Sequence, residues 1–125
     1  MKRWILIGTG TLLVVAVIAV YAVIGIQEDR AKQAALAATP VVGVSQVEIQ
    51  NYLFVPARIE VAPGTTVTWT NDDDAPHSIT FDDGMKDSGL FRLGGKFSYT
   101  FTTPGTYSYH CSEHPYMVGA VIVTG

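Results

Sequence analysis

The sequence predicts an all-β domain, a β-sandwich of seven to eight short strands, preceded by an apolar N-terminal segment. From Ser45 onward, apolar and polar residues alternate with a period of two, which is the pattern of strands that bury one face. Turn signals such as Ala62-Pro63-Gly64 and Thr103-Pro104-Gly105 separate these runs at short intervals. The chain has 125 residues, so residues 45–125 form one small domain.

The N-terminal segment is long and apolar enough to cross a membrane. Lys2 and Arg3 precede an uncharged stretch from Trp4 to Ile26, and these 23 residues reach about 30 Å as a helix, the thickness of a hydrocarbon core. Because the positive residues come before this stretch and Glu28 comes after it, the positive-inside rule places residues 1–3 in the cytoplasm. The β domain then lies on the extracytoplasmic side, in a periplasm or at the cell surface.

A cleaved signal peptide is the alternative, with Val20-Tyr21-Ala22 or Ala35-Leu36-Ala37 as cleavage sites. The apolar run is long for that purpose, because the apolar region of a signal peptide usually spans ~7–15 residues. The second cleavage site also lies beyond four charged residues. We therefore expect residues 4–26 to be an uncleaved transmembrane anchor, and a soluble periplasmic domain only if the segment is cleaved.

Residues 27–44 are expected to link the anchor to the β domain. The alanine-rich part, Ala31 to Ala38, favours a helix that continues for two more turns until Thr39-Pro40 stops it.

Alternation identifies the inward-facing residues of the β domain. Seven runs carry them: Val47 and Ile49; Ile59 and Val61; Val67 and Trp69; His77, Ile79 and Phe81; Phe97, Tyr99 and Phe101; Tyr107, Tyr109 and Cys111; and Val118 to Thr124. The last run is apolar on both faces, which is typical of a central strand covered on each side. Residues 84–95 are a glycine-punctuated connection. His77 and Cys111 are therefore expected to face the core, whereas His110 faces away from Cys111.

The segment after the sixth run contains three potential metal ligands. Cys111, the only cysteine, is followed by His114 and then by Met117 at intervals of three residues. A thiolate, an imidazole and a thioether suit copper far better than magnesium or calcium, which prefer oxygen. Zinc accepts sulfur and nitrogen but has little use for a thioether. A copper site of this kind needs a second histidine, and His77 on its inward face is the candidate.

These motifs resemble those of the small blue copper proteins, the cupredoxins. The resemblance lies in Cys111-x2-His114-x2-Met117 at the end of a strand and in the upstream His77 preceded by Pro76; the short loop with Pro115 is most similar to amicyanin and plastocyanin-like members. It covers about Val47 to Thr124. It implies a Greek-key β-sandwich and one type 1 copper ion bound by His77, Cys111, His114 and Met117. Many members carry Asn where this chain has Ser78, a position that braces the two ligand loops.

The resemblance further implies electron transfer, with copper cycling between Cu(I) and Cu(II). The expected partners are redox proteins, such as a cytochrome, a dehydrogenase or an oxidase, and the copper domain is expected to be monomeric. An enzyme is disfavoured because copper oxidases and nitrite reductases add histidine-rich substrate sites, and only His110 remains here. Copper storage or delivery is the alternative function, although a chain with three methionines lacks the Met-rich tracts that favour it.

Charge narrows the range of partners. From Ser45 onward the chain has four basic and nine acidic residues, so nucleic acid is excluded as a partner. Asp72 to Asp74 are near His77 in sequence. They form either an ordinary solvated loop or part of a docking site for a basic partner.

Overall fold

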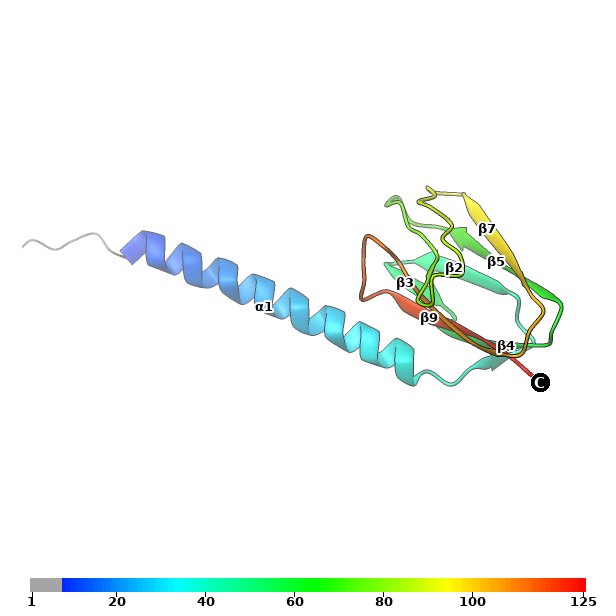
Figure 1. Ribbon diagram of the computed structural model, residues 1–125. Helices are drawn as coiled ribbons and strands as arrows, with labels where there is room; N and C mark the ends of the chain where they lie inside the picture. Colours follow the sequence, from blue (N-terminus) through cyan, green and yellow to red (C-terminus); the bar gives the residue numbers. More distant parts are fainter. Residues whose placement is uncertain (1–7) are drawn as a thin grey trace, which may run out of the picture.

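The computed structural model describes residues 8–125 and contains one long helix and two β-sheets (Figure 1). The elements in chain order are α1 (Gly8–Ala37), β1 (Val41–Val42), β2 (Gln46–Gln50), β3 (Leu53–Val55), β4 (Arg58–Val61), β5 (Thr65–Asn71), β6 (Thr80–Phe81), β7 (Lys96–Phe101), β8 (Gly105–His110) and β9 (Val118–Val123). Residues 1–7, which include Lys2, Arg3 and Trp4, lie outside the described residues.

Helix α1 runs without a break through the alanine-rich residues and ends at Ala37, two residues before the Thr39-Pro40 stop. Among the described residues, it is the one helix long and apolar enough to cross a membrane. Large apolar side chains between Leu12 and Ile26 are exposed along it, so this part of the helix is not a core element of the β domain. Figure 1 shows the helix extending away from the domain.

The β domain is a sandwich of two sheets, which confirms the predicted fold class. One sheet has the strand order β1-β4-β9-β8-β6, and the other has the order β3-β2-β5-β7. Strands β2 and β5 pair in parallel, as do β4 and β9, because the chain crosses between the sheets in the manner of a Greek key. Strand β9 lies in the middle of its sheet, in agreement with its two apolar faces.

The core between the sheets is centred on Trp69, which is fully buried. Its ring lies 5.4 Å from that of Tyr109, 6.2 Å from that of Phe81 and 6.5 Å from that of Phe101, all in edge-to-face orientations. Such orientations are favoured because the positive edge of one ring meets the negative face of the next. The inward residues predicted by alternation supply most of this core. It forms a rigid base for the loops at one end of the sandwich.

The structure has nine strands, two more than alternation alone identifies. Strand β1 lies within the residues expected to form the linker and pairs in parallel with β4. Strand β3 follows a two-residue turn after β2 and pairs with it. Strands of two and three residues are too short for a period of two to be visible in the sequence.

The run from His77 to Phe81 is only partly a strand, because β6 contains Thr80 and Phe81 alone. His77 instead forms an isolated bridge with Phe91, with backbone hydrogen bonds of 3.1 and 2.9 Å in the two directions. Residues 84–95, which the sequence predicts to be an irregular connection, thus contain Phe91, the backbone partner of His77. His77 nevertheless faces inward and is fully buried, as alternation predicts.

Candidate metal centre

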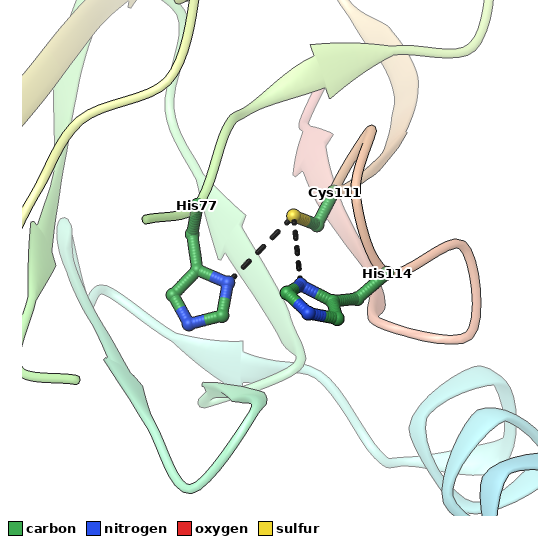
Figure 2. A group of neighbouring side chains, drawn as sticks. All are labelled: His77, Cys111 and His114. Atoms are coloured by element: carbon green, nitrogen blue, oxygen red, sulfur yellow. Dashed lines mark hydrogen bonds between the residues drawn. The ribbon is translucent and has the colours of Figure 1, made fainter. Parts of the chain in front are cut away.

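Three side chains from distant parts of the sequence meet at one end of the sandwich. The sulfur of Cys111 lies 3.7 Å from Nδ1 of His77 and 3.7 Å from Nδ1 of His114. Figure 2 shows the two contacts as dashed lines that meet at the sulfur. The three donor atoms all lie within 4.8 Å of one another. Cys111 and His77 are fully buried, whereas His114 is partly exposed. The structure therefore brings together three of the four residues that the sequence predicts as ligands around a common point.

The fourth predicted ligand, Met117, closes the loop that begins at Cys111. The amide of Cys111 donates to the carbonyl of Met117 at 3.1 Å, and the amide of Met117 donates to the carbonyl of His114 at 2.8 Å. These two bonds fold the loop back on itself and hold His114 over Cys111. The Met117 side chain is buried at the base of the loop.

The spacing of the donor atoms fits a metal ion. Two donors that lie ~2.0–2.3 Å from one ion and ~120° apart are ~3.7 Å from each other. This is the distance from the Cys111 sulfur to each Nδ1 atom. One thiolate and two imidazoles in a trigonal arrangement, with a thioether nearby, form the donor set that copper favours.

Asp73 holds the buried imidazole of His77 from the opposite side. Its carboxylate accepts hydrogen bonds from the amides of Asn51 (2.8 Å) and Tyr52 (2.9 Å) and from Nε2 of His77 (2.9 Å). Burial favours a raised pKa for Asp73, but the hydrogen bonds from Tyr52, Asn51 and His77 outweigh it and lower the pKa. An ionised carboxylate can only accept, so Nε2 of His77 carries the proton and Nδ1 keeps its lone pair toward Cys111.

Tyr52 lies over both imidazoles. It follows Asn51 in a two-residue turn between β2 and β3, and both residues have positive φ angles, of 52° and 58°. Bulky residues seldom adopt this conformation, and the two hydrogen bonds to Asp73 stabilise it here. The Tyr52 ring stands nearly perpendicular to those of His77 (centroids 5.3 Å apart) and His114 (5.0 Å apart). Tyr52 is 41% exposed, so it separates part of the site from solvent.

Ser78 braces the two ligand loops. Its hydroxyl oxygen accepts a hydrogen bond from the amide of Ser112 at 2.9 Å, and the hydroxyls of the two serines lie 3.0 Å apart. Ser78 follows His77 and Ser112 follows Cys111, so this bond joins the residues next to two predicted ligands. The contact made by asparagine in many cupredoxins is thus made by serine in this chain.

The other two histidines differ in environment. His110 faces away from Cys111, as alternation predicts, and its Nδ1 lies 2.6 Å from a carboxylate oxygen of Asp82. For His114, burial lowers the pKa and the neighbouring His77 lowers it further, while Glu113 and Glu28 oppose the shift. A lowered pKa favours the neutral imidazole, which is the form that binds metals.

Asp73 and Tyr52 are the site residues that the sequence did not reveal. In the sequence, Asp73 is one of three consecutive acidic residues, and no pattern distinguishes Tyr52. The available local signal is Asn51, which follows the alternating run that contains Val47 and Ile49, because asparagine favours tight turns.

Comparison with known proteins places this geometry among characterised copper proteins. Residues 41–124 match the family model described as copper binding proteins, plastocyanin/azurin family. Amicyanin-alpha of Methylorubrum extorquens is 36% identical over 86 residues, which cover 65% of this chain and 72% of that protein. Amicyanin of Paracoccus denitrificans is 32% identical over 120 residues, which cover 89% of this chain and 92% of that protein.

The solved structure of a purple cupredoxin from Nitrosopumilus maritimus is also similar. It is 35% identical in sequence, and the superposition has a TM-score of 0.60. The match covers 65% of this chain and all of that one.

Proposed function

Because this chain belongs to the plastocyanin/azurin family of copper-binding proteins, we propose that it carries single electrons on one type 1 copper ion. His77, Cys111 and His114 would bind the ion through two nitrogens and a sulfur, and Met117 would be the weak axial ligand. The bound copper would supply the Cu(I)/Cu(II) couple. The observation that carries this proposal is the equal distance of 3.7 Å from the Cys111 sulfur to the two Nδ1 atoms.

The residues around the donors support a carrier whose site keeps its shape when its charge changes. The backbone pairing with Phe91 and the carboxylate of Asp73 fix the position and tautomer of His77. The bond between Ser78 and Ser112 fixes the start of the other ligand loop. Donors that are held by the fold need little rearrangement when an electron arrives or leaves, so transfer can be fast.

His114 is the proposed port for electrons. It is the partly exposed member of the three donors and lies in the loop between β8 and β9. The rings of Tyr52 and Tyr116 flank its imidazole, with centroids 5.0 and 6.2 Å away. A redox protein that contacts this edge would come close to the metal without entering the core. Burial of His77 and Cys111 disfavours storage or delivery, because an ion that is handed over must leave through accessible ligands.

The proposed location follows from helix α1. Its exposed apolar residues fit a membrane-spanning anchor, and the positions of Lys2, Arg3 and Glu28 orient the copper domain toward the extracytoplasmic side. The redox partners would meet the domain there.

The test of function is the colour of the copper-loaded full chain. We expect Cu(II) to produce an intense blue absorption that bleaches on reduction and returns on oxidation. Cys111→Ala should abolish the colour, because the thiolate supplies the charge-transfer bond. His110→Ala serves as the control. His110 is next to Cys111 in the chain but its side chain points away from it, so this variant should keep the blue colour. A colourless wild-type chain that binds one zinc ion would refute the proposal.

A further inference from the structure

The last turns of helix α1 pack along the copper domain instead of standing free of it. Glu28, Ala31, Ala35 and Ala38 are half-buried, and their spacing of three and four residues places them on one face of the helix. Alanine side chains allow this face to approach the domain closely. Near the end of the helix, Nη1 of Arg58 donates a hydrogen bond of 3.2 Å to the carbonyl of Leu36. These contacts place the last turns of the helix against the domain.

The residues nearest to the apolar stretch contact the end of the domain that contains the metal centre. Gln27 and Glu28 line a groove whose other wall includes Asn51, Tyr52 and Tyr116. Burial raises the pKa of Tyr116, and the negative charge of Glu28 adds to the same shift. Two of the wall residues, Tyr52 and Tyr116, are those that flank His114.

The last residues of the helix contact a part of the domain that lies farther from the apolar stretch. Ala35 and Ala38 line a second groove together with Phe54, Ala57 and Val118, and this groove extends to Tyr116 and Met117. Strand β1 follows the helix and runs parallel to β4 and β9, and β9 begins next to Met117. The end of the domain with the metal centre is therefore the end nearest to the apolar stretch. Figure 1 shows the same arrangement: the loop between β8 and β9 lies beside the helix, and the C-terminus lies at the opposite end of the domain.

Helix geometry gives the height of this end above a membrane. Glu28 is two residues beyond Ile26, where the apolar stretch ends, and at 1.5 Å per residue this is ~3 Å along the helix. The polar headgroup layer on each side is thicker than that, at ~5–7 Å, since the full bilayer exceeds its hydrocarbon core by ~10–15 Å in total. The edge of His114 thus lies at the level of the headgroups if residues 4–26 span the bilayer.

Exposed apolar side chains occur at the same end of the domain. Tyr52 is in the turn over the imidazoles, and Leu53 follows it with 38% of its surface exposed. Leu90 and Leu93 are 53% and 59% exposed and flank Phe91, the backbone partner of His77. Exposed apolar residues also occur elsewhere on the domain, as at Val42, but those next to the metal centre favour an interaction surface there.

We propose that helix α1 holds the electron-transfer face of the copper domain toward the bilayer, where it docks an integral membrane protein whose redox group lies at the same membrane surface. The inference rests on the proposed electron-transfer function and on the membrane anchor. A globular soluble carrier would meet the lipid headgroups before it reached His114. A membrane protein approaches laterally in the plane of the bilayer, so its extramembrane surface can reach Tyr52, Leu90 and Leu93.

Orientation can be tested without copper by NMR of the full chain in lipid nanodiscs whose lipids carry a gadolinium chelate on the headgroup. Paramagnetic broadening should be strong for the amides of Tyr52, Leu90 and Glu113 and weak for those of Gly64 and Gly105, which lie at the other end of the strands. Equal broadening at the two ends, or stronger broadening at Gly64 and Gly105, would overturn the proposed orientation.

A matched pair of double variants tests the role of the helix face. Ala31→Glu with Ala35→Glu places two charges on the packed face and should release the domain, so that the difference in broadening between the two ends disappears. Gln33→Glu with Ala37→Glu adds the same charge at the same spacing on the exposed face. This control should keep the wild-type difference, and its loss in the control would show that charge alone frees the domain.

Docking is tested by electron exchange of the copper-loaded chain in nanodiscs with two oxidants, hexacyanoferrate(III) and a small soluble c-type cytochrome. The cytochrome should oxidise the wild type about tenfold more slowly than the Ala31→Glu, Ala35→Glu variant, because approach to the face is restricted. Hexacyanoferrate(III), a small ion, should oxidise both at similar rates.

The outcomes separate the two proposals. A chain that exchanges electrons with neither oxidant contradicts the proposed function, while the NMR result still decides the orientation. Equal rates of the two chains with the cytochrome contradict the docking inference and leave electron transfer intact. If hexacyanoferrate(III) is also slow with the wild type alone, the bilayer itself covers the face, and docking to a membrane protein is refuted.

Discussion

His77 and Asp73 are joined by a hydrogen bond of 2.9 Å between Nε2 of the imidazole and a carboxylate oxygen. The same carboxylate accepts from the two amides of the Asn51-Tyr52 turn. One side chain therefore sets the tautomer of a buried predicted ligand and also holds the ring that covers the site. A negative charge next to the imidazole stabilises the more positive state of a bound metal.

Replacement of Asp73 should change the redox properties of the site. Asp73→Asn removes the charge and at least one of the three hydrogen bonds, so the oxidised form loses more stability than the reduced form. We expect the reduction potential to rise by some tens of millivolts and Cu(II) affinity to fall about 10–100-fold. Asp74→Asn removes the same charge from an exposed neighbour and is the control. The reduction potentials are measured by redox titration. Equal shifts in the two variants would show that the loss of one negative charge, and not the loss of the hydrogen bond to His77, causes the change.

Tyr52 should slow the loss of copper. Its ring covers both imidazoles, so Tyr52→Ala should expose His114 and accelerate the removal of Cu(I) by a water-soluble chelator several-fold. Tyr52→Phe keeps the ring and its edge-on contacts and should release copper at the wild-type rate. If the alanine and phenylalanine variants release copper equally fast and both faster than the wild type, the hydroxyl group and not the ring protects the site. If all three rates are equal, Tyr52 does not protect the site.

Ser78 should contribute to the stability of the ligand loops. In Ser78→Ala the amide of Ser112 loses its partner, and we expect the free energy of unfolding to fall by about 1 kcal/mol. Ser78→Asn, which restores the residue common in the family, should retain most of that stability. Ser108→Ala, at an exposed position on β8, is the control. Chemical denaturation of the full chain in detergent measures all three, and a Ser78→Ala variant as stable as the control would show that the brace has no energetic role.

Gly119 should tolerate no side chain. A Cβ atom at this position would lie 2.5 Å from both Cζ and the hydroxyl oxygen of Tyr109. Tyr109 is buried and packs against Trp69 and Phe54, so its ring has no free space to move into. We expect Gly119→Ala to destabilise the domain by about 1–3 kcal/mol in thermal or chemical unfolding. Gly125→Ala, where the nearest atom to a new Cβ is 3.9 Å away, should have no measurable effect.

The native protein should remain with the membrane. A helix that spans the hydrocarbon core resists extraction by high salt and by alkaline carbonate, whereas a peripheral protein is released. We expect the chain in the pellet after both washes and in the supernatant after a nonionic detergent. An N-terminus of the mature protein near Val23 or Ala38 would instead establish cleavage of a signal peptide.

The sequence predicted those parts of the molecule that depend on local patterns. A period of two is set by neighbouring residues, so it correctly placed His77 and Cys111 on inward faces and His110 on an outward one. The contact of Asp73 with Tyr52 joins residues 21 positions apart, and no local sequence pattern predicts such a contact. The packing of helix α1 on the domain is not predictable for the same reason, because an alanine-rich stretch indicates a helix but not the surface that the helix contacts.

Because the connection after helix α1 is short, the length of that helix determines how far the copper domain lies from the apolar stretch. Strand β1 begins at Val41, so only Ala38, Thr39 and Pro40 separate it from the end of the helix. Seven residues inserted after Ile26 would raise the domain by ~10 Å and turn it by only ~20°, because two helical turns contain 7.2 residues. Five residues would raise it by ~7.5 Å and turn it by ~140°, away from its original neighbour. If residues 4–26 span a bilayer, the number of residues in helix α1 sets both the height of the proposed redox centre above the bilayer and its rotation about the helix axis.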